Sequence, residues 1–577
     1  MAAIVPWALL LTFLSGIPVA RQLRHHPRGL WLLFFTEMWE RFSYYGMRAL
    51  LIFYLTEHFL LDDAAAQERY AAYTTLNYLL PLAGGLVGDR LLGARRAVAF
   101  GALLLVAGHG AMALEGPAAR QYLHYQGTAY TLEASGRGEA RQERLVRGDG
   151  VALTIHRRTD GTILVEEPRG PLPPRIEKSR YRLEVEPVPP LSQAIFHLAL
   201  ALIVVGVGFQ KANMTALVGA LYKHRPEERT QGFTLYMFGI NIGAFWSSVL
   251  CGWLGMRFGW WAGFGAAGVG MAMGYAAFLR LAPLLGEAGQ PPAGRESLRH
   301  FWPVALATVP VIALVWYLVQ HFALVGLLLG FSTAAIALFL ALFLWRQCDT
   351  GERLRTGLAL ALVLLAMVWT AFAEQTGSLL ALFAERNSTL AIGSLAINAA
   401  QVTAFYMGFV LIAVPVLAGL WDWLGRRHAD PAPITKFIFA FALQALAFAL
   451  LGMSGAFADG GHRVPLALIV LALLLHAVSE MTYSPVGLAE MTRLAPARIL
   501  STLVAVWYLA ISWGQWLGGL IARAAAAPAQ DAAVSLPIYL GIFRAVAGGA
   551  LIAMLATGLL AWWLRRRHRR LLLPLPD

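Results

Sequence analysis

The chain has 577 residues, of which 58% are hydrophobic and 14% are charged, and it contains only two cysteines. A soluble domain carries about 25% charged residues, so this composition excludes a soluble enzyme, a disordered chain and a disulfide scaffold. The 46 lysines and arginines outnumber the 33 acidic residues. Because most of these cations lie in short segments between apolar runs, we expect a membrane protein with basic cytoplasmic loops and no nucleic-acid partner.

Residues 1–29 form an N-terminal segment that is apolar as far as residue 20 and basic after it. No Lys or Arg precedes the apolar run, which argues against a cleaved signal peptide. The run fits either a membrane-spanning helix or a helix that lies in the membrane interface, and the sequence leaves both alternatives open.

The rest of the chain is dominated by apolar runs. A membrane core of about 30 Å is crossed by about 20 helical residues, and the runs predict about fourteen such helices, because lipid cannot satisfy the edge of a strand. The fold class is therefore an all-α membrane protein with two six-helix halves and an extra two-helix hairpin. We expect three helices over 30–115, three over 191–285, a linker and the extra pair over 286–355, six over 356–564 and a basic tail over 565–577.

Residues 116–190 interrupt the apolar pattern with a charged segment rich in Gly and Pro. Residues 151–157 and 162–167 alternate like strands and flank Asp160 and Gly161, which is a hairpin signal. Residues 181–185 predict a further strand. We expect a small β-rich insert outside the membrane, with either a structural role or a role in binding an unidentified partner or capturing substrate.

The distribution of basic residues predicts the orientation in the membrane. Paired arginines such as Arg95 and Arg96, or Arg426 and Arg427, recur at alternate helix ends, and the tail adds several more. Cytoplasmic loops carry such an excess of Lys and Arg. We therefore expect a multi-pass membrane protein with its tail in the cytoplasm; the resemblance given below implies the bacterial inner (plasma) membrane.

A short repeat supports the division into halves. Residues 88–96 follow the second main helix and residues 421–427 follow the eighth, and each segment combines an Asp, a Gly and paired Arg. Paired halves with a binding site near the midplane are typical of transporters. The first copy resembles the loop signature of the major facilitator superfamily.

Ionisable residues lie inside the predicted membrane spans, where each costs about 2.5–3.5 kcal/mol. The first long helix carries four of them, and at 100° per residue three of these fall on one stripe with Tyr44. Others lie in three later helices, so the set contains both signs of charge and draws on both halves. The full set is Glu37, Glu40, Arg41, Arg48, Lys211, Glu374 and Glu480.

This set of charges favours a carrier of small zwitterions. Cations on one wall and a carboxylate on another suit a solute with both charges, and an ionised neighbour changes the affinity of a carboxyl group for protons. We therefore expect proton coupling, with protons as the coupling ion and no other cofactor. A carrier of an amino acid, nitrate or another small anion remains an alternative, although Glu480 disfavours a simple anion.

Two further alternatives lie outside the carriers. A membrane-embedded transferase would need a metal or an acid–base cluster at one interface, and the sequence contains no HExxH, no CxxC and no paired His within the spans. No catalytic residue and no metal ligand is therefore predicted. A receptor without transport activity is disfavoured, because the set of ionisable residues inside the spans is intact.

Five segments resemble signatures of the proton-dependent oligopeptide transporters, a family within the major facilitator superfamily, and the extra helix pair is similar to that of its bacterial members. The segments are 35–48 (ExxERFxYYG), 208–213 (GxxKPN), 233–243 (ending INxG), 372–377 (EQxG) and 480–488 (ELxxSPxGL). The resemblance implies the major facilitator fold and the symport of protons with di- and tripeptides by alternating access.

The resemblance also implies roles at the substrate. Arg41 and Lys211 would hold the peptide carboxylate, and Glu480 would bind the ammonium group and pair with Lys211 across the cytoplasmic gate. Asn241 would bind the peptide backbone. The remaining residues would line the site, and they are Tyr45, Tyr78, Ser484 and Trp507.

For the outer gate and the proton, the resemblance implies that Arg48 pairs with Glu374 and that Glu37 and Glu40 take part in proton coupling. From the residues alone, simpler alternatives remain. Tyr78 and Trp507 also suit ordinary core packing, and Ser484 also suits relief of a kink at the neighbouring proline. We assign no proton role to His197 or His476, and we expect both to be hydrogen-bonded or to face the lumen.

Three positions depart from the family pattern. Ala212 replaces the proline that usually follows the lysine of the fourth helix, and Met237 replaces a tyrosine of the fifth. The QSxNP pattern of the eighth helix is missing, and its asparagine aligns with Tyr406. One ligand for the amino end of the peptide is therefore absent, which leaves peptide length and preference open.

Overall fold

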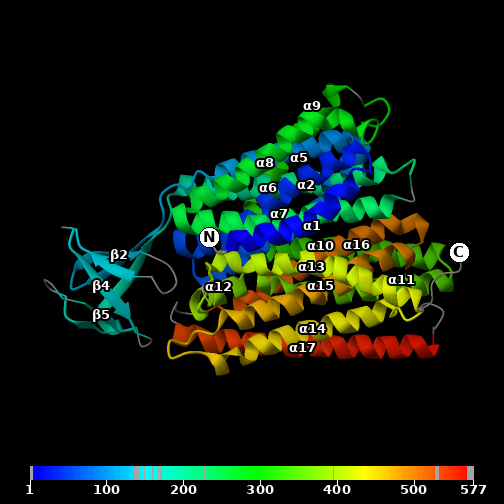
Figure 1. Cartoon of the computed structure of the whole chain (residues 1–577). Helices are drawn as coiled ribbons and strands as arrows, with labels where there is room; N and C mark the ends of the chain where they lie inside the picture. Colours follow the sequence, from blue (N-terminus) through cyan, green and yellow to red (C-terminus); the bar gives the residue numbers. More distant parts are fainter. Residues whose placement is uncertain are drawn as a thin grey trace.

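Long helices form one bundle, and a small β insert projects from one end of it (Figure 1). This computed structural model describes residues 4–567 except 136–141, 149, 159–160, 167, 169–171, 226–227, 296, 394, 495 and 527–531. Asp160 and the last part of the basic tail therefore lie outside the described residues. We refer to the end of the bundle that carries the insert as the insert end and to the opposite end as the tail end.

The first half contains six main helices. They are α2 (Arg28–Phe53), α3 (Asp63–Leu79) continued by α4 (Pro81–Val87), α5 (Ala94–Met112), α6 (Pro190–Leu221), α7 (Arg229–Phe258) and α8 (Trp260–Leu281). The Asp62 side chain begins α3 by accepting a hydrogen bond from Ala65 N, which satisfies one of the free N–H groups of the first turn.

A helix pair and the second half follow. The pair is α9 (Phe301–Leu318) and α10 (Phe322–Gln347). The second half contains α11 (Thr350–Ala373) continued by α12 (Leu379–Asn387), α13 (Val402–Arg426), α14 (Pro433–Met453), α15 (Leu466–Leu494), α16 (Leu500–Ala524) and α17 (Ala532–Arg567). The second half begins at Thr350 rather than at 356, because Asp349 and Glu352 form a capping box there.

Eleven helices in the described ranges are long and apolar enough to cross a membrane. α1 (Ile4–Leu23), α2, α3 and α5 are not among these eleven, yet they lie side by side with them in the bundle. α2 falls short because it carries the ionisable residues of the first long span. The predicted all-α membrane fold with a β-rich insert is confirmed.

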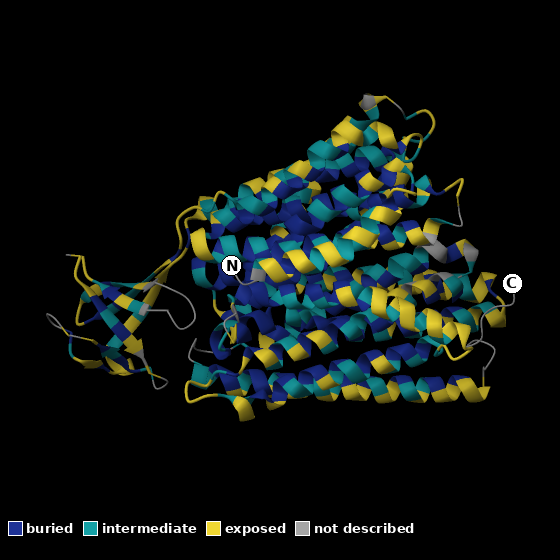
Figure 2. Ribbon diagram, in the orientation of Figure 1, coloured by how far each residue is buried: buried dark blue, intermediate teal, exposed yellow. Residues whose placement is uncertain are grey.

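The two halves meet along two seams, where α3 packs against α16 and α7 packs against α13. The extra pair lies outside these seams, with α9 against α6 and α10 against α3 and α16. Large apolar side chains such as Leu306 and Phe331 remain exposed on this pair. Figure 2 shows the same exposure along the periphery, as expected for surfaces that face lipid.

Glycines allow the helices of the first half to approach closely. A Cβ atom on Gly84 would lie 2.1 Å from the carbonyl oxygen of Gly208, so α4 and α6 touch backbone to backbone at this point. Small residues permit such contacts in membrane helices. The contact positions Lys211, which is on the next turn of α6.

The insert between α5 and α6 is a seven-stranded antiparallel sheet in the order β6-β5-β4-β3-β2-β1-β7. Its strands are β1 (Arg120–Tyr125), β2 (Thr128–Ser135), β3 (Gln142–Val146), β4 (Ala152–Arg157), β5 (Ile163–Val165), β6 (Arg175–Ile176) and β7 (Tyr181–Glu186). β4 pairs with β5, which confirms the predicted hairpin. β1 and β7 pair with each other, and Arg120 lies opposite Glu186 where the two strands join the bundle. We refer to this pair of strands as the stalk of the insert.

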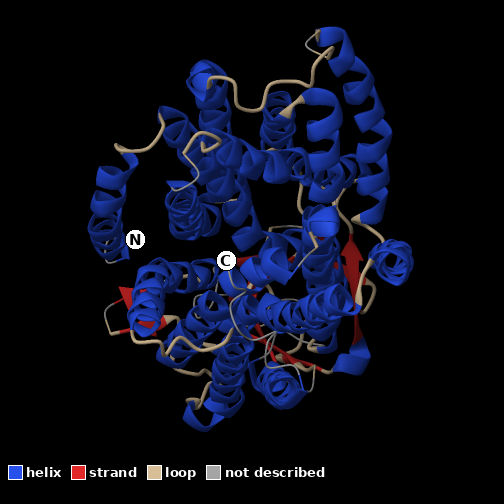
Figure 3. Cartoon of the chain, turned by 90° about the vertical axis from the view of Figure 1, so that its right-hand side faces the viewer, coloured by secondary structure: helices blue, strands red, loops and turns tan. Residues whose placement is uncertain are grey.

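The N-terminal segment forms a helix of its own, α1 (Ile4–Leu23). α1 lies lengthwise along the bundle and contacts α7 and α13 (Figure 1). α1 is not among the eleven helices that meet the length and hydropathy criteria for a span, but it runs parallel to the helices that do, which is the arrangement expected of a spanning helix rather than of one that lies flat in the interface. Figure 3 looks along the bundle from the tail end, with the N-terminus at the edge of the molecule.

Candidate functional site

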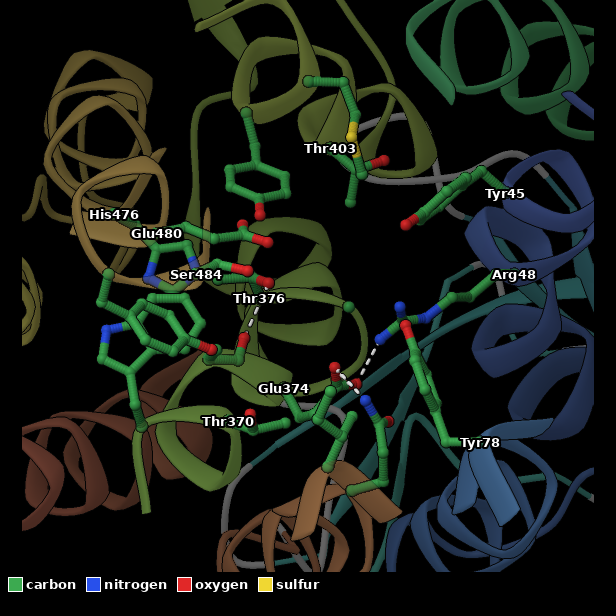
Figure 4. A pocket seen from close by; sticks show the side chains of 18 of the residues that line it. Tyr45, Arg48, Tyr78, Thr370, Glu374, Thr376, Thr403, His476, Glu480 and Ser484 are labelled. Carbon is green, nitrogen blue, oxygen red and sulfur yellow. Dashed lines mark hydrogen bonds and ion pairs between the residues drawn. The ribbon is translucent and has the colours of Figure 1, made fainter. Parts of the chain in front are cut away.

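A cavity of about 300 Å³ lies between the two halves. It is lined from the first half by α2, α3, α6 and α7, and from the second half by α11, α13, α15 and α16. Eight of the predicted site residues line it, and they are Tyr45, Arg48, Tyr78, Lys211, Glu374, Glu480, Ser484 and Trp507. Figure 4 shows Tyr45, Arg48 and Tyr78 on one wall and His476, Glu480 and Ser484 on the opposite one.

An ion pair joins the two halves at the insert-end side of the cavity. The Arg48 guanidinium contacts the Glu374 carboxylate (Figure 4). Arg48 Nε also donates to the Tyr70 hydroxyl at 2.6 Å, and Gln515 Nε2 donates to Glu374 Oε1 at 2.6 Å. Neighbouring donors thus hold the carboxylate in place, and the contact is the one that the resemblance implied for the outer gate.

A second ion pair between the halves lies nearer the insert end, and the sequence analysis did not identify it. Arg386 of α12 binds both oxygens of Asp63 on α3, with distances of 2.6 and 2.7 Å. It also donates to the Tyr539 hydroxyl at 3.0 Å. Both charged side chains are more than nine-tenths buried, at 7% and 8% exposure. One feature of the sequence could have indicated this pair: Arg386 is a single basic residue in a segment that the predicted orientation places outside, where basic residues are few.

The charges nearer the tail end are arranged differently. No ion pair joins Lys211 to Glu480 within the part of the chain that the structure describes. Lys211 Nζ instead lies 3.6 Å from the centroid of the Tyr78 ring, which is a cation–π contact. Glu480 Oε2 is buried without a hydrogen-bond partner. In this conformation the pair expected at the cytoplasmic gate is not formed, so its formation stays a prediction for another conformation.

Arg41 forms a compact ionic cluster beside the cavity. Its Nε lies 2.9 Å from Glu37 Oε1 and 2.7 Å from Glu40 Oε2, and all three residues are buried. Two carboxylates and one guanidinium leave an excess negative charge, which one proton would neutralise. Arg41 is not among the residues that line the cavity, and neither is Asn241 on α7, so in this conformation the predicted peptide contacts of these two residues are not in place.

An aromatic wall completes the cavity and was not identified from the sequence. The Trp369 ring stacks on His476 at 5.2 Å and packs against Tyr483 at 4.3 Å, while Tyr406 lies 5.3 Å from His476. Trp369 Nε1 donates to Ser479 Oγ at 2.9 Å, which fixes the indole. Positions 476, 480, 483 and 484 share one face of α15. This helical spacing could have identified the four residues as neighbours on the cavity wall.

His476 fits the second of the two expected alternatives, a histidine that faces the lumen. It lines the cavity, and its Nδ1 is buried without a hydrogen-bond partner. His197, in contrast, lies with Nε2 3.2 Å from an Arg69 nitrogen near the insert end. The described residues contain no group of three or more His, Cys, Asp or Glu that could hold a metal ion.

The family profile described as "POT family" matches residues 95–284 and 345–537, which is more than half of the chain. The chain belongs to the POT family. The matched ranges include α6, α7, α13, α15 and α16, which carry much of the cavity wall, and they exclude α1, α9 and nearly all of α10. The prediction of a transporter rather than an enzyme is confirmed by this membership.

Relatives and solved structures agree with this assignment. A di-/tripeptide transporter of Lactococcus lactis subsp. lactis is 26% identical over 86% of this chain and 89% of its own. A peptide transporter of Yersinia enterocolitica is 27% identical over 88% and 89% of the two chains. A crystal structure of a point mutant of the peptide transporter POT with alafosfalin has a TM-score of 0.70 and 26% identity, and covers 95% of this chain and 96% of that one.

Proposed function

We propose that this protein is a proton-coupled symporter that imports di- and tripeptides across the bacterial inner membrane by alternating access. The tail end would face the cytoplasm and the insert end would face outside. The observation that carries the proposal is the cavity between the halves, with Lys211 on one wall and Glu480 on the other. A peptide zwitterion carries its ammonium and carboxylate at opposite ends, and opposite charges on facing walls complement it.

Glu480 would bind the peptide ammonium, since a buried carboxylate oxygen without a hydrogen-bond partner gains a charged donor in this way. Lys211 would bind the peptide carboxylate from the Tyr78 side. The aromatic wall of Trp369, Tyr406 and His476 offers an apolar surface for a peptide side chain.

The Arg41 cluster would link the proton to the peptide. As long as Glu37 and Glu40 are both ionised, they occupy the Arg41 guanidinium. A proton on either carboxylate would remove one ionic partner, and the guanidinium would become available to the peptide carboxylate beside Lys211. Proton binding would then strengthen peptide binding, and release of the proton to the cytoplasm would release the peptide.

Alternating access would exchange one set of ion pairs for another. Arg48–Glu374 and Asp63–Arg386 join the halves at the insert end. Opening to the outside would separate both pairs, while Lys211 and Glu480 would approach each other as the tail end closes. Buried ion pairs of this kind are costly to break singly, so pairing at one end offsets separation at the other.

The test is uptake of labelled dialanine by proteoliposomes with an imposed proton gradient. A potential of about 150 mV and one pH unit together supply about 5 kcal/mol per proton, which supports accumulation of about a few thousand-fold. Accumulation should vanish with a protonophore. Concentrative uptake that survives the protonophore would rule out proton coupling, and competition by free amino acids or nitrate instead of peptides would favour those substrates.

A further inference from the structure

The helix α1 lies over the seam where the two halves meet beside the cavity. It shares one apolar cluster with both halves: Ala8 of α1 packs with Phe245 of α7 and with Met407 of α13. Met407 also lines the cavity. α1 therefore lies directly behind the cavity wall, whereas Trp7, Phe13 and Leu14 on its opposite face are more than 60% exposed and face the lipid.

Hydrogen bonds fix α1 to the first half. Trp246 Nε1 of α7 donates to Thr12 Oγ1 at 2.9 Å, and Trp31 Nε1 of α2 donates to the carbonyl of Leu23 at 3.1 Å. Residues 24–27 connect α1 directly to α2, and within this connection His26 Nδ1 lies 2.8 Å from the Tyr222 hydroxyl. Because these contacts are at both the middle and the tail end of the helix, α1 is expected to move with the first half.

The contact with the second half is of another kind. Leu11 lies above Gly408 of α13, where an added Cβ would come within 3.6 Å of Leu11 Cδ2. Within the described ranges, no hydrogen bond or ion pair joins α1 to α13. Apolar contact is non-directional, so it opposes sliding less than a hydrogen bond would. Because Gly408 has no side chain, Leu11 can move across α13 at this point without a steric obstacle.

We propose that α1 is a transmembrane strap that moves with the first half and keeps the seam between α7 and α13 closed to lipid while α13 slides beneath it. A membrane carrier whose halves rock must separate and rejoin this seam in every cycle. An apolar helix attached to one side covers the seam without tying the halves together. The proposal requires the alternating access described above but not a peptide substrate.

Two matched cysteine pairs test the proposal in protein whose Cys251 and Cys348 are replaced by alanine. Leu11→Cys with Gly408→Cys links α1 to α13, and Thr12→Cys with Trp246→Cys links α1 to α7, each through a short flexible bis-thiosulfonate. Because conformational cycling limits transport, the α1–α13 link should reduce dialanine uptake at least about tenfold, reversibly on reduction, and the α1–α7 link should leave it within about twofold.

A second measurement does not depend on the substrate. Hydrogen–deuterium exchange at residues 379–393, at the insert end, reports opening of that end. Exchange should fall in the α1–α13 linked protein and stay unchanged in the α1–α7 linked protein. If the Trp246 variant fails to fold, Ala8→Cys with Ala244→Cys provides another link between α1 and α7.

The outcomes separate this proposal from the proposed function. Unchanged exchange with the α1–α13 link, or an equal loss with both links, overturns the strap. If unlinked protein takes up no dialanine while exchange still responds only to the α1–α13 link, the peptide assignment fails and the strap stands.

Discussion

The two ends of the cavity differ in whether their buried charges form ion pairs between the halves. At the insert end, Arg48–Glu374 and Asp63–Arg386 tie the halves together. Farther toward the tail end, Lys211 and Glu480 face the same cavity, and among the described residues no ion pair joins them. The difference shows that the pairing of buried charges, rather than their presence, distinguishes the two ends. In the proposed cycle, breaking the ion pairs at the insert end and forming the Lys211–Glu480 pair nearer the tail end would reverse the side to which the cavity opens.

The largest effect is expected from the unpaired charges. Lys211→Ala and Glu480→Ala should each strongly reduce counterflow of labelled dialanine, because each removes a peptide ligand and leaves the other charge stranded in the closed state, at about 3–5 kcal/mol. The double variant should cost clearly less than the sum. Lys436→Ala, which alters a buried lysine paired with Asp430 away from the cavity, serves as the control. Additivity within about 0.5 kcal/mol would mean that the two residues do not meet.

The Arg41 cluster should separate net uptake from exchange. Glu40→Gln should reduce gradient-driven uptake about tenfold or more while it spares exchange of labelled for unlabelled peptide, because exchange needs no net proton release. Glu352→Gln removes a carboxylate that binds Arg498 outside the cavity and should leave both unchanged. Equal loss of uptake and exchange in Glu40→Gln would assign the cluster a structural role instead.

A smaller effect is expected at the insert end, where the buried pair Asp63–Arg386 can be compared with a third, more exposed pair between the halves, Glu68–Arg523. Arg386→Ala should slow transport by about tenfold, since it strands the buried Asp63, and the exchange of the two charges, Asp63→Arg with Arg386→Asp, should recover part of the rate. Arg523→Ala breaks an exposed pair with Glu68 and should change the rate less than about twofold. Similar losses in Arg386→Ala and Arg523→Ala would show that burial does not decide the strength of this gate.

The smallest effect is expected from the insert. Replacing residues 121–185 by a short Gly/Ser bridge keeps Ala119 and Val188, which are buried in the bundle, and should leave uptake within a few-fold. The insert joins only α5 and α6 of the first half, so neither gate includes it. Complete loss of uptake in a folded deletion would show that the insert takes part in transport.

The sequence predicted the helical membrane fold because apolar runs of sufficient length have no other stable form in lipid. It also predicted most of the charged site, since Arg48, Lys211, Glu374 and Glu480 are conspicuous in apolar surroundings. Asp63–Arg386 was missed because both residues lie at helix ends, where charges are common. The positions of Arg41 and Asn241 outside the cavity depend on which conformation the halves adopt, and no local pattern encodes that.

The stalk of the insert has a practical consequence. β1 pairs with β7, and Ala119 N donates to the carbonyl of His58 at 2.9 Å, so the sheet is anchored to the first half rather than hung on a loose loop. Helical bundles embedded in detergent offer few features for particle alignment in electron cryomicroscopy. The projecting sheet (Figure 1) is a natural fiducial mark, and its tilt against the detergent belt would report the rotation of the first half in each imaged particle.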